Sequence, residues 1–201
     1  MWVVKIGGSL CADPMLPHWL DLLARLGGGR VTIVAGGGVF SDEVRRIQSH
    51  WQFGDLAAHN MAVLAMAQFA YQLHAINPTL QLAKRKSEIP QVLHRGQTAL
   101  WLPFELQRDQ LDSRTNWAAT SDTIALDLAR QLNAEHLVMV KSCAIDPALS
   151  LDQLGQAGVL DESFAERSRG AAFPIDVMHK TELGRMRAML LGGPPFPLRA
   201  A

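Results

Sequence analysis

The stretch VVKIGGS, residues 3–9, is an apolar run that contains one lysine and ends in two glycines. A second run of the same kind, VTIVAGGG, covers residues 31–38. Apolar, β-branched runs bounded by glycine are typical of strands. A lysine inside such a strand is costly to bury without a partner, so Lys5 suggests that the end of the strand approaches a negatively charged group. The plainer alternative is an edge strand followed by a turn.

The glycines that end these two runs have a physical use. Glycine lets a backbone come close to a ligand, and the N–H groups of such turns, with the helix N-terminus behind them, form anion-binding sites. Two clusters after consecutive strands therefore indicate two phosphates, or one phosphate and a second acidic group. Tight turns without a ligand are the alternative.

Strand and helix patterns alternate along the chain, which predicts parallel βαβ units and a sheet covered on both faces. We expect strands at 2–7, 30–36, 98–103, 136–142 and 172–178. Helices are expected at 15–26, 41–51 (with a Ser-Asp cap), 55–75, 121–132, 150–154, 161–168 and 181–191. Residues 76–97 are ambiguous, with a possible short strand at 90–96. Helix 55–75 is apolar nearly all round, so it should be heavily buried or lie in an interface.

The bulk composition limits the function classes. The chain has 201 residues, 48% of them apolar, and equal numbers of acidic and basic side chains. We expect one domain over residues 1–193 and a flexible tail over 194–201. A net charge of zero argues against a general nucleic-acid binder. Two cysteines are too few for a disulfide framework, and no targeting or membrane-spanning segment is evident, so we expect a soluble cytoplasmic protein without a membrane partner.

Parallel strands bring their carboxyl ends to one edge of a sheet, where ligands bind. That rule places four polar or glycine-rich segments together. They are Gly7, Gly8 and Ser9; Gly36, Gly37 and Gly38; Thr120, Ser121 and Asp122; and Lys141 and Ser142. Neither the Walker A pattern nor the dinucleotide-binding fingerprint is present among them, and no Cys/His spacing typical of zinc appears.

The segments VVKIGGS, IVAGGG and TSDTIALDLARQL resemble signature segments of the amino acid kinase superfamily. The resemblance covers about residues 2–145. It is closest to a small subgroup, the aminomethylfuranyl-methyl phosphate kinases of methanofuran biosynthesis and their methylotroph relatives, through AHNMAVLAMAQFA, ALWLP, NWAATSD and LVMVKS. The resemblance implies a three-layer αβα sandwich around an open, mostly parallel sheet. It also implies transfer of the γ-phosphoryl group of ATP, as its Mg²⁺ complex, to a carboxylate, carbamate or phosphate.

The resemblance assigns roles to the residues at this edge. Lys5 contacts the transferring phosphoryl group, and Asp122 orients the catalytic lysines. The resemblance assigns phosphate or nucleotide binding to Gly7, Gly8, Ser9 and Lys141, and the edge rule adds Thr120, Ser121 and Ser142. Two features depart from the family: KSCAID stands where other members have an Asp-Val-Asp-Gly-like string, and Lys180 lies in the half of the chain where many members have a second catalytic lysine, but in a different context.

The acceptor side is expected to include the turn Gly36, Gly37 and Gly38, with Arg45, His59 and Asn60. Trp117 offers a flat surface for a ring, or else belongs to the core. A phosphate monoester needs more donors than a carboxylate, and this set supplies them. We therefore expect a phosphate monoester, and the resemblance to the subgroup implies [5-(aminomethyl)furan-3-yl]methyl phosphate as the leading acceptor, with a diphosphate product. A carboxylate or carbamate kinase and a non-catalytic anion-binding protein stay open, and a homodimer through residues 55–75 is expected.

Overall fold

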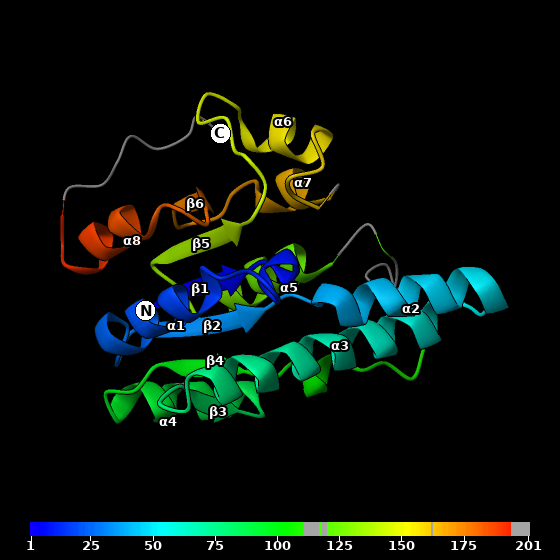
Figure 1. Ribbon diagram of the computed structural model, residues 1–201, viewed down its shortest axis with the longest axis horizontal. Helices are drawn as coiled ribbons and strands as arrows, with labels where there is room; N and C mark the ends of the chain where they lie inside the picture. The colour runs from blue at the N-terminus through cyan, green and yellow to red at the C-terminus, as the bar shows by residue number, and fades with distance from the viewer. Residues whose placement is uncertain (111–116, 118–119, 162, 194–201) are drawn as a thin grey trace.

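The computed structural model describes residues 1–110, 117, 120–161 and 163–193. Six parallel strands form one sheet in the order β3-β4-β2-β1-β5-β6 (Figure 1). The expected parallel α/β fold is confirmed, and the sheet draws on strands from both ends of the chain. The predicted tail, 194–201, lies outside the described residues. The strands are β1 (Trp2–Ile6), β2 (Val31–Ala35), β3 (Gln81–Ala83), β4 (Ala99–Trp101), β5 (His136–Lys141) and β6 (Ile175–His179).

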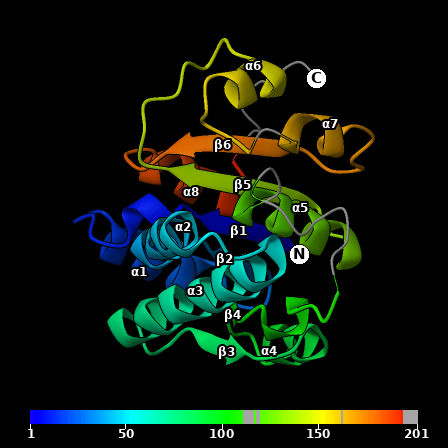
Figure 2. The ribbon, with the colours of Figure 1, turned by 90° about the vertical axis from the view of Figure 1, so that its right-hand side faces the viewer.

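Helices cover both faces of the sheet, which gives the expected three layers (Figure 2). The first face packs against α1 (Leu16–Leu26), α3 (Asp55–Ile76) and α8 (Leu183–Leu190). The second face packs against α4 (Ile89–His94), α5 (Ser121–Gln131), α6 (Leu151–Gln156) and α7 (Phe164–Ser168). Helix α2 (Gly38–Trp51) lies along α3.

Strand β1 lies between β2 and β5, so its side chains are buried on both faces. Successive side chains of a strand point to opposite faces. Val4 and Ile6 join the core under α1, α3 and α8, whereas Val3 joins the core under α5. Lys5 shares the face of Val3 and is therefore directed toward α5. The alternative of an edge strand for residues 2–7 is excluded.

Two local predictions are wrong. Residues 90–96 do not form a strand, because α4 (Ile89–His94) occupies most of them, with a proline in its first turn where the missing N–H costs nothing. The strand in this region is β3, earlier in the chain. Helix α2 begins at Gly38 instead of at the expected Ser-Asp cap, and Ser41 is buried within its first turn.

Eight of the 22 residues of α3 are buried, so the apolar helix is covered on one side and one stripe faces outward. Leu64 and Tyr71 lie two turns apart on that stripe and are 41% and 44% exposed. In the part of the chain that the structure describes, no helix combines the length and apolar character needed to cross a membrane.

Candidate active site

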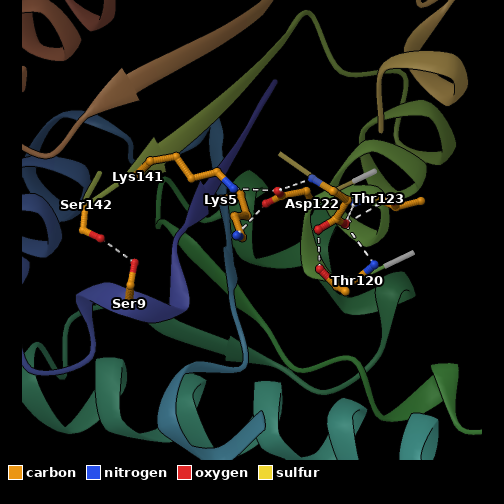
Figure 3. A network of polar contacts seen from close by, with 8 residues as sticks. Lys5, Ser9, Thr120, Asp122, Thr123, Lys141 and Ser142 are labelled. Carbon is orange, nitrogen blue, oxygen red and sulfur yellow. Dashed lines mark hydrogen bonds and ion pairs between the residues drawn. The ribbon is translucent and has the colours of Figure 1, made fainter. Parts of the chain in front are cut away.

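Two lysines and one aspartate meet at the carboxyl edge of the sheet (Figure 3). Lys5 comes from β1, Lys141 from the end of the neighbouring β5, and Asp122 from the first turn of α5. Lys5 Nζ lies 2.6 Å from Asp122 Oδ1 as an ion pair, and Lys141 Nζ donates to Oδ2 at 2.6 Å. Lys5 and Asp122 are almost completely buried. One carboxylate thus holds two ammonium groups side by side.

The charges of this cluster are strongly coupled. Burial by itself raises the pKa of Asp122, but the ammonium groups of Lys5 and Lys141 outweigh it and bring the pKa to about 2. Burial, followed by repulsion from Lys5, lowers the pKa of Lys141. Asp122 is therefore ionised throughout the neutral range, and its two cations have one negative charge between them. The two ammonium groups exceed the Asp122 charge by one, which favours an anionic ligand group at this edge.

Asp161, from the segment before α7, completes the cluster, and its sequence context gave no sign of it. Its carboxylate accepts from the backbone N–H groups of Thr120 and Thr123 at 2.9 and 3.1 Å, and from both hydroxyls. Its own N–H donates to Asp122 Oδ2 at 3.2 Å. Asp161 therefore caps α5 from outside the helix and fixes the turn that holds Asp122. Burial, together with the Asp122 charge, raises the pKa of Asp161.

The two glycine turns touch each other. A Cβ atom on Gly8 would lie 2.2 Å from the Gly38 nitrogen, and one on Gly36 would lie 2.5 Å from the Gly8 nitrogen. Both positions therefore accept only glycine in this arrangement. Gly38 also has φ +57°, in the left-handed region that favours glycine. The contact brings the backbone of the phosphate turn and the N-terminus of α2 to one place.

A cavity of about 230 Å³ opens beside these turns. One end is lined by the two glycine turns, Ser9, and the Thr120–Ser121 start of α5. The other end lies between α2 and α3 and is lined by Arg45, Asp55, His59 and Trp117, among others. Two helix N-termini and the strand ends therefore border one cavity, as the edge rule predicted. Ser9 also contacts Ser142 through their hydroxyl oxygens at 2.6 Å, which links β1 and β5 at this edge (Figure 3).

The residues expected on the acceptor side do not all line the cavity. Arg45 stacks on the indole of Trp117, with Cζ 4.3 Å from the ring centroid, and both line the cavity. His59 also lines it, and its Nε2 lies 3.0 Å from the Leu106 carbonyl oxygen. Asn60 is not among the described lining residues. Its amide exchanges two hydrogen bonds of 2.8 Å with the backbone of Arg108, so it anchors that loop to α3.

Lys180 does not join the cluster. Its Nζ pairs with Asp13 Oδ2 at 2.5 Å, and its N–H donates to the Lys141 carbonyl at 2.8 Å. The second lysine on Asp122 is Lys141, which the sequence placed only near a nucleotide. Among the described residues, no group of three or more His, Cys, Asp or Glu side chains is placed to hold a metal ion.

A family model described as "Amino acid kinase family" matches residues 1–144, more than half of the chain. The chain belongs to the amino acid kinase family. The resemblance of VVKIGGS, IVAGGG and TSDTIALDLARQL is thereby confirmed, and the match includes Lys5, Asp122 and Lys141. Asp161 and Lys180 lie beyond it.

Among curated proteins, this amino acid kinase resembles the [5-(aminomethyl)furan-3-yl]methyl phosphate kinase of Methanocaldococcus jannaschii, with 25% identity over 141 residues. The alignment covers 69% of this chain and 64% of that protein, so the chain spans less than two thirds of its relative's length. Among solved structures, uridylate kinase from Archaeoglobus fulgidus superposes with a TM-score of 0.69 at 14% identity, covering 96% of each chain. UMP kinase from Bacillus anthracis also gives 0.69, at 17% identity, over 95% of this chain and 91% of that one. These structures share the fold.

Proposed function

We propose that this chain transfers the γ-phosphoryl group of ATP to the phosphate of a small monoester, most favourably [5-(aminomethyl)furan-3-yl]methyl phosphate, in the cytoplasm. The observation that carries the proposal is the pair of buried lysines on Asp122, next to two touching glycine turns. The two glycine turns offer two anion sites, one for the donor phosphates and one for an acceptor phosphate. The name of the curated relative supports the choice of acceptor, and its modest identity makes the acceptor a proposal to test.

In this reaction an oxygen of the acceptor phosphate attacks the γ-phosphorus of ATP, and the bond from that phosphorus to the β–γ bridging oxygen breaks. ADP leaves, and the acceptor becomes a diphosphate ester. A phosphate monoester is largely a dianion at neutral pH because its second pKa is about 6, so the attacking oxygen needs no general base. The protein's task is in-line positioning and charge stabilisation.

Lys5 and Lys141 supply positive charge where the transferring group gathers negative charge, and Asp122 keeps them aimed. A preorganised donor of this kind typically contributes about 3–4 kcal/mol to lowering the barrier. The turn of Gly7, Gly8 and Ser9, the start of α5 and Ser142 would hold the donor phosphates through N–H and hydroxyl groups. Mg²⁺ would come with ATP, held mainly by phosphate oxygens, and would neutralise part of their charge.

The acceptor phosphate would lie against the Gly36–Gly38 turn and the N-terminus of α2. Arg45 lines the same cavity and adds a guanidinium, which can bind a phosphate through two hydrogen bonds. Trp117 offers the flat surface expected for a ring, and His59 borders the cavity. In this proposal Asn60 ties the loop at Arg108 to α3 and does not contact the acceptor itself.

A coupled assay for ADP release tests the proposal. The acceptors are [5-(aminomethyl)furan-3-yl]methyl phosphate, uridine monophosphate, isopentenyl phosphate, acetylglutamate and carbamate. We expect the furan phosphate to give the highest kcat/KM and both carboxyl compounds to give the lowest, because the cavity offers donors for a dianion. A carboxylate or carbamate that exceeds every phosphate monoester would overturn the acceptor assignment. Anion binding without ADP release from any of them would favour the alternative of a non-catalytic anion-binding protein.

We also propose that the chain forms a two-fold homodimer through α3. The outward stripe with Leu64 and Tyr71 ends near Ile76, which is 40% exposed, and Trp51 at the end of α2 is 72% exposed. Light scattering at micromolar concentration should give twice the chain mass of 22.0 kDa. Tyr71→Asp should shift the protein to monomer, whereas Leu191→Asp, at the exposed residue that follows α8, should leave the mass unchanged. A wild-type protein that is monomeric at this concentration would refute the proposal.

A further inference from the structure

The charges around the cavity do not match a purely anionic acceptor. Its described lining includes two carboxylates, Asp42 and Asp55, and one guanidinium, Arg45. With histidine counted as neutral, these side chains carry one excess negative charge. A phosphate that enters next to two carboxylates is repelled unless something compensates them. An acceptor that carries its own positive charge at the end away from the phosphate removes this conflict.

The two carboxylates have different environments. Asp42 pairs with Arg45, its Oδ1 lying 3.1 Å from Nη1, so its charge is already matched. Asp55 accepts from the Gln48 side-chain amide at 2.9 Å, and no lysine or arginine of the described chain forms an ion pair with it. As the first residue of α3, Asp55 also stabilises that helix terminus. That role accounts for an acid at this position but does not supply a cation.

The position of Asp55 suits the far end of a small acceptor. It is held by Gln48, ten residues after Gly38 on α2, which at about 1.5 Å per residue is roughly 15 Å along the helix. With covalent bonds of about 1.5 Å, the phosphorus and the ammonium nitrogen of an extended aminomethylfuranyl-methyl phosphate are roughly 8 Å apart. The difference between these two lengths is covered by a hydrogen bond of about 3 Å at each end of the acceptor and by the length of the aspartate side chain.

A connected set of side chains joins the two ends. The Gln48 amide donates to Asp55, and its oxygen accepts from the Trp117 indole N–H at 2.6 Å. The Arg45 guanidinium in turn stacks on the Trp117 ring. From the glycine turns outward, the cavity therefore presents backbone N–H groups, a flat aromatic surface and then a carboxylate. That is the order of phosphate, ring and ammonium group in the acceptor.

We propose that Asp55 binds the ammonium group of the acceptor and so selects amine-bearing phosphate esters over esters that lack a cation. This inference rests on the proposed function. Uridine monophosphate and isopentenyl phosphate have no ammonium group, so Asp55 disfavours them. Gln48 is a positioning residue in this account, because it orients both Asp55 and Trp117.

The test compares two acceptors in wild type and variants. One is [5-(aminomethyl)furan-3-yl]methyl phosphate, and the other is (5-methylfuran-3-yl)methyl phosphate, which lacks the amine. Asp55→Asn should lower kcat/KM for the amine compound by about threefold to fivefold, as expected for loss of an ion pair with an exposed carboxylate, and leave it nearly unchanged for the methyl compound. Asp55→Glu, which keeps the charge, should restore most of the preference.

Asp42→Asn is the matched control, because it removes the other carboxylate of the same cavity. Asp42→Asn should change kcat/KM by the same factor for both acceptors. A wild type that uses both esters equally well, or an Asp55→Asn variant that loses activity equally with both, would overturn the assignment of Asp55 alone. A wild type that phosphorylates neither ester would overturn the proposed function and this inference with it.

Discussion

Replacing Lys5 by methionine is expected to lower kcat by about a hundredfold or more while leaving the chain folded. Methionine keeps the length of the side chain but removes the ammonium group that lies 2.6 Å from Asp122. The neutral side chain should be tolerated in a buried position, because Lys141 still pairs with the remaining carboxylate. The loss should therefore appear in turnover and not in the melting temperature.

Lys141→Met should have an effect of the same order, since both lysines share Asp122. The double variant should lose less than the product of the two single effects, because the lysines act on the same transferring group. Lys84→Met, at an exposed position, is the matched control and should keep wild-type turnover. Steady-state kinetics with saturating ATP and acceptor measure all four variants. Near-normal turnover in Lys5→Met or Lys141→Met would remove that lysine from the mechanism.

Asp122→Asn is a less clean test of catalysis than the lysine variants, because Asp122 lies between two lysines in the interior. Removing its charge leaves both cations without their partner, a change that typically costs about 3–5 kcal/mol. The lysine variants are therefore the better probe of catalysis.

Gly8→Ala is expected to damage both stability and activity. The added Cβ would lie 2.2 Å from the Gly38 nitrogen and 2.7 Å from its Cα, so one glycine turn must move away from the other. Backbone atoms cannot rotate aside as a side-chain end can, and we expect a loss of about 3 kcal/mol or more, or roughly 6–12 °C in Tm for a chain of this size. Because both phosphates are proposed to bind at these turns, kcat/KM should fall by about a hundredfold or more.

Gly54→Ala is the control for this experiment. Nothing lies within 4 Å of a Cβ at Gly54, and its backbone is in the extended region. Thermal unfolding and kinetics of both variants should show a large loss for Gly8→Ala and little change for Gly54→Ala. Wild-type stability and activity in Gly8→Ala would show that the two turns do not need their close contact.

The fold was largely readable from the sequence because its signals are local. The short apolar run of β1 that ends in glycines and the helical spacing of α1 and α5 are properties of consecutive residues. Helix α4, with six residues, is too short for periodicity to distinguish it from a strand. Helix α2 begins at Gly38, three residues before Ser41, because the glycine turn itself forms the start of the helix.

Only part of the candidate site could be predicted from the sequence, for a related reason. Lys5, Asp122 and the glycine turns follow from strand ends and the edge rule. The pairing of β1 with β5, which places Lys141 beside Lys5, joins strands more than 120 residues apart. Asp161 reaches α5 from 38 or more residues away and looks like an ordinary acid before a short helix. No local pattern distinguishes such a residue.

In the proposed reaction this site moves a phosphoryl group onto a phosphate oxygen. Phosphorus NMR of the protein with ATP, Mg²⁺ and [5-(aminomethyl)furan-3-yl]methyl phosphate follows that transfer. We expect the monoester singlet to be replaced by two mutually coupled doublets of a diphosphate ester, at the rate at which ADP appears. ADP and inorganic phosphate formed while the monoester signal stays unchanged would contradict it.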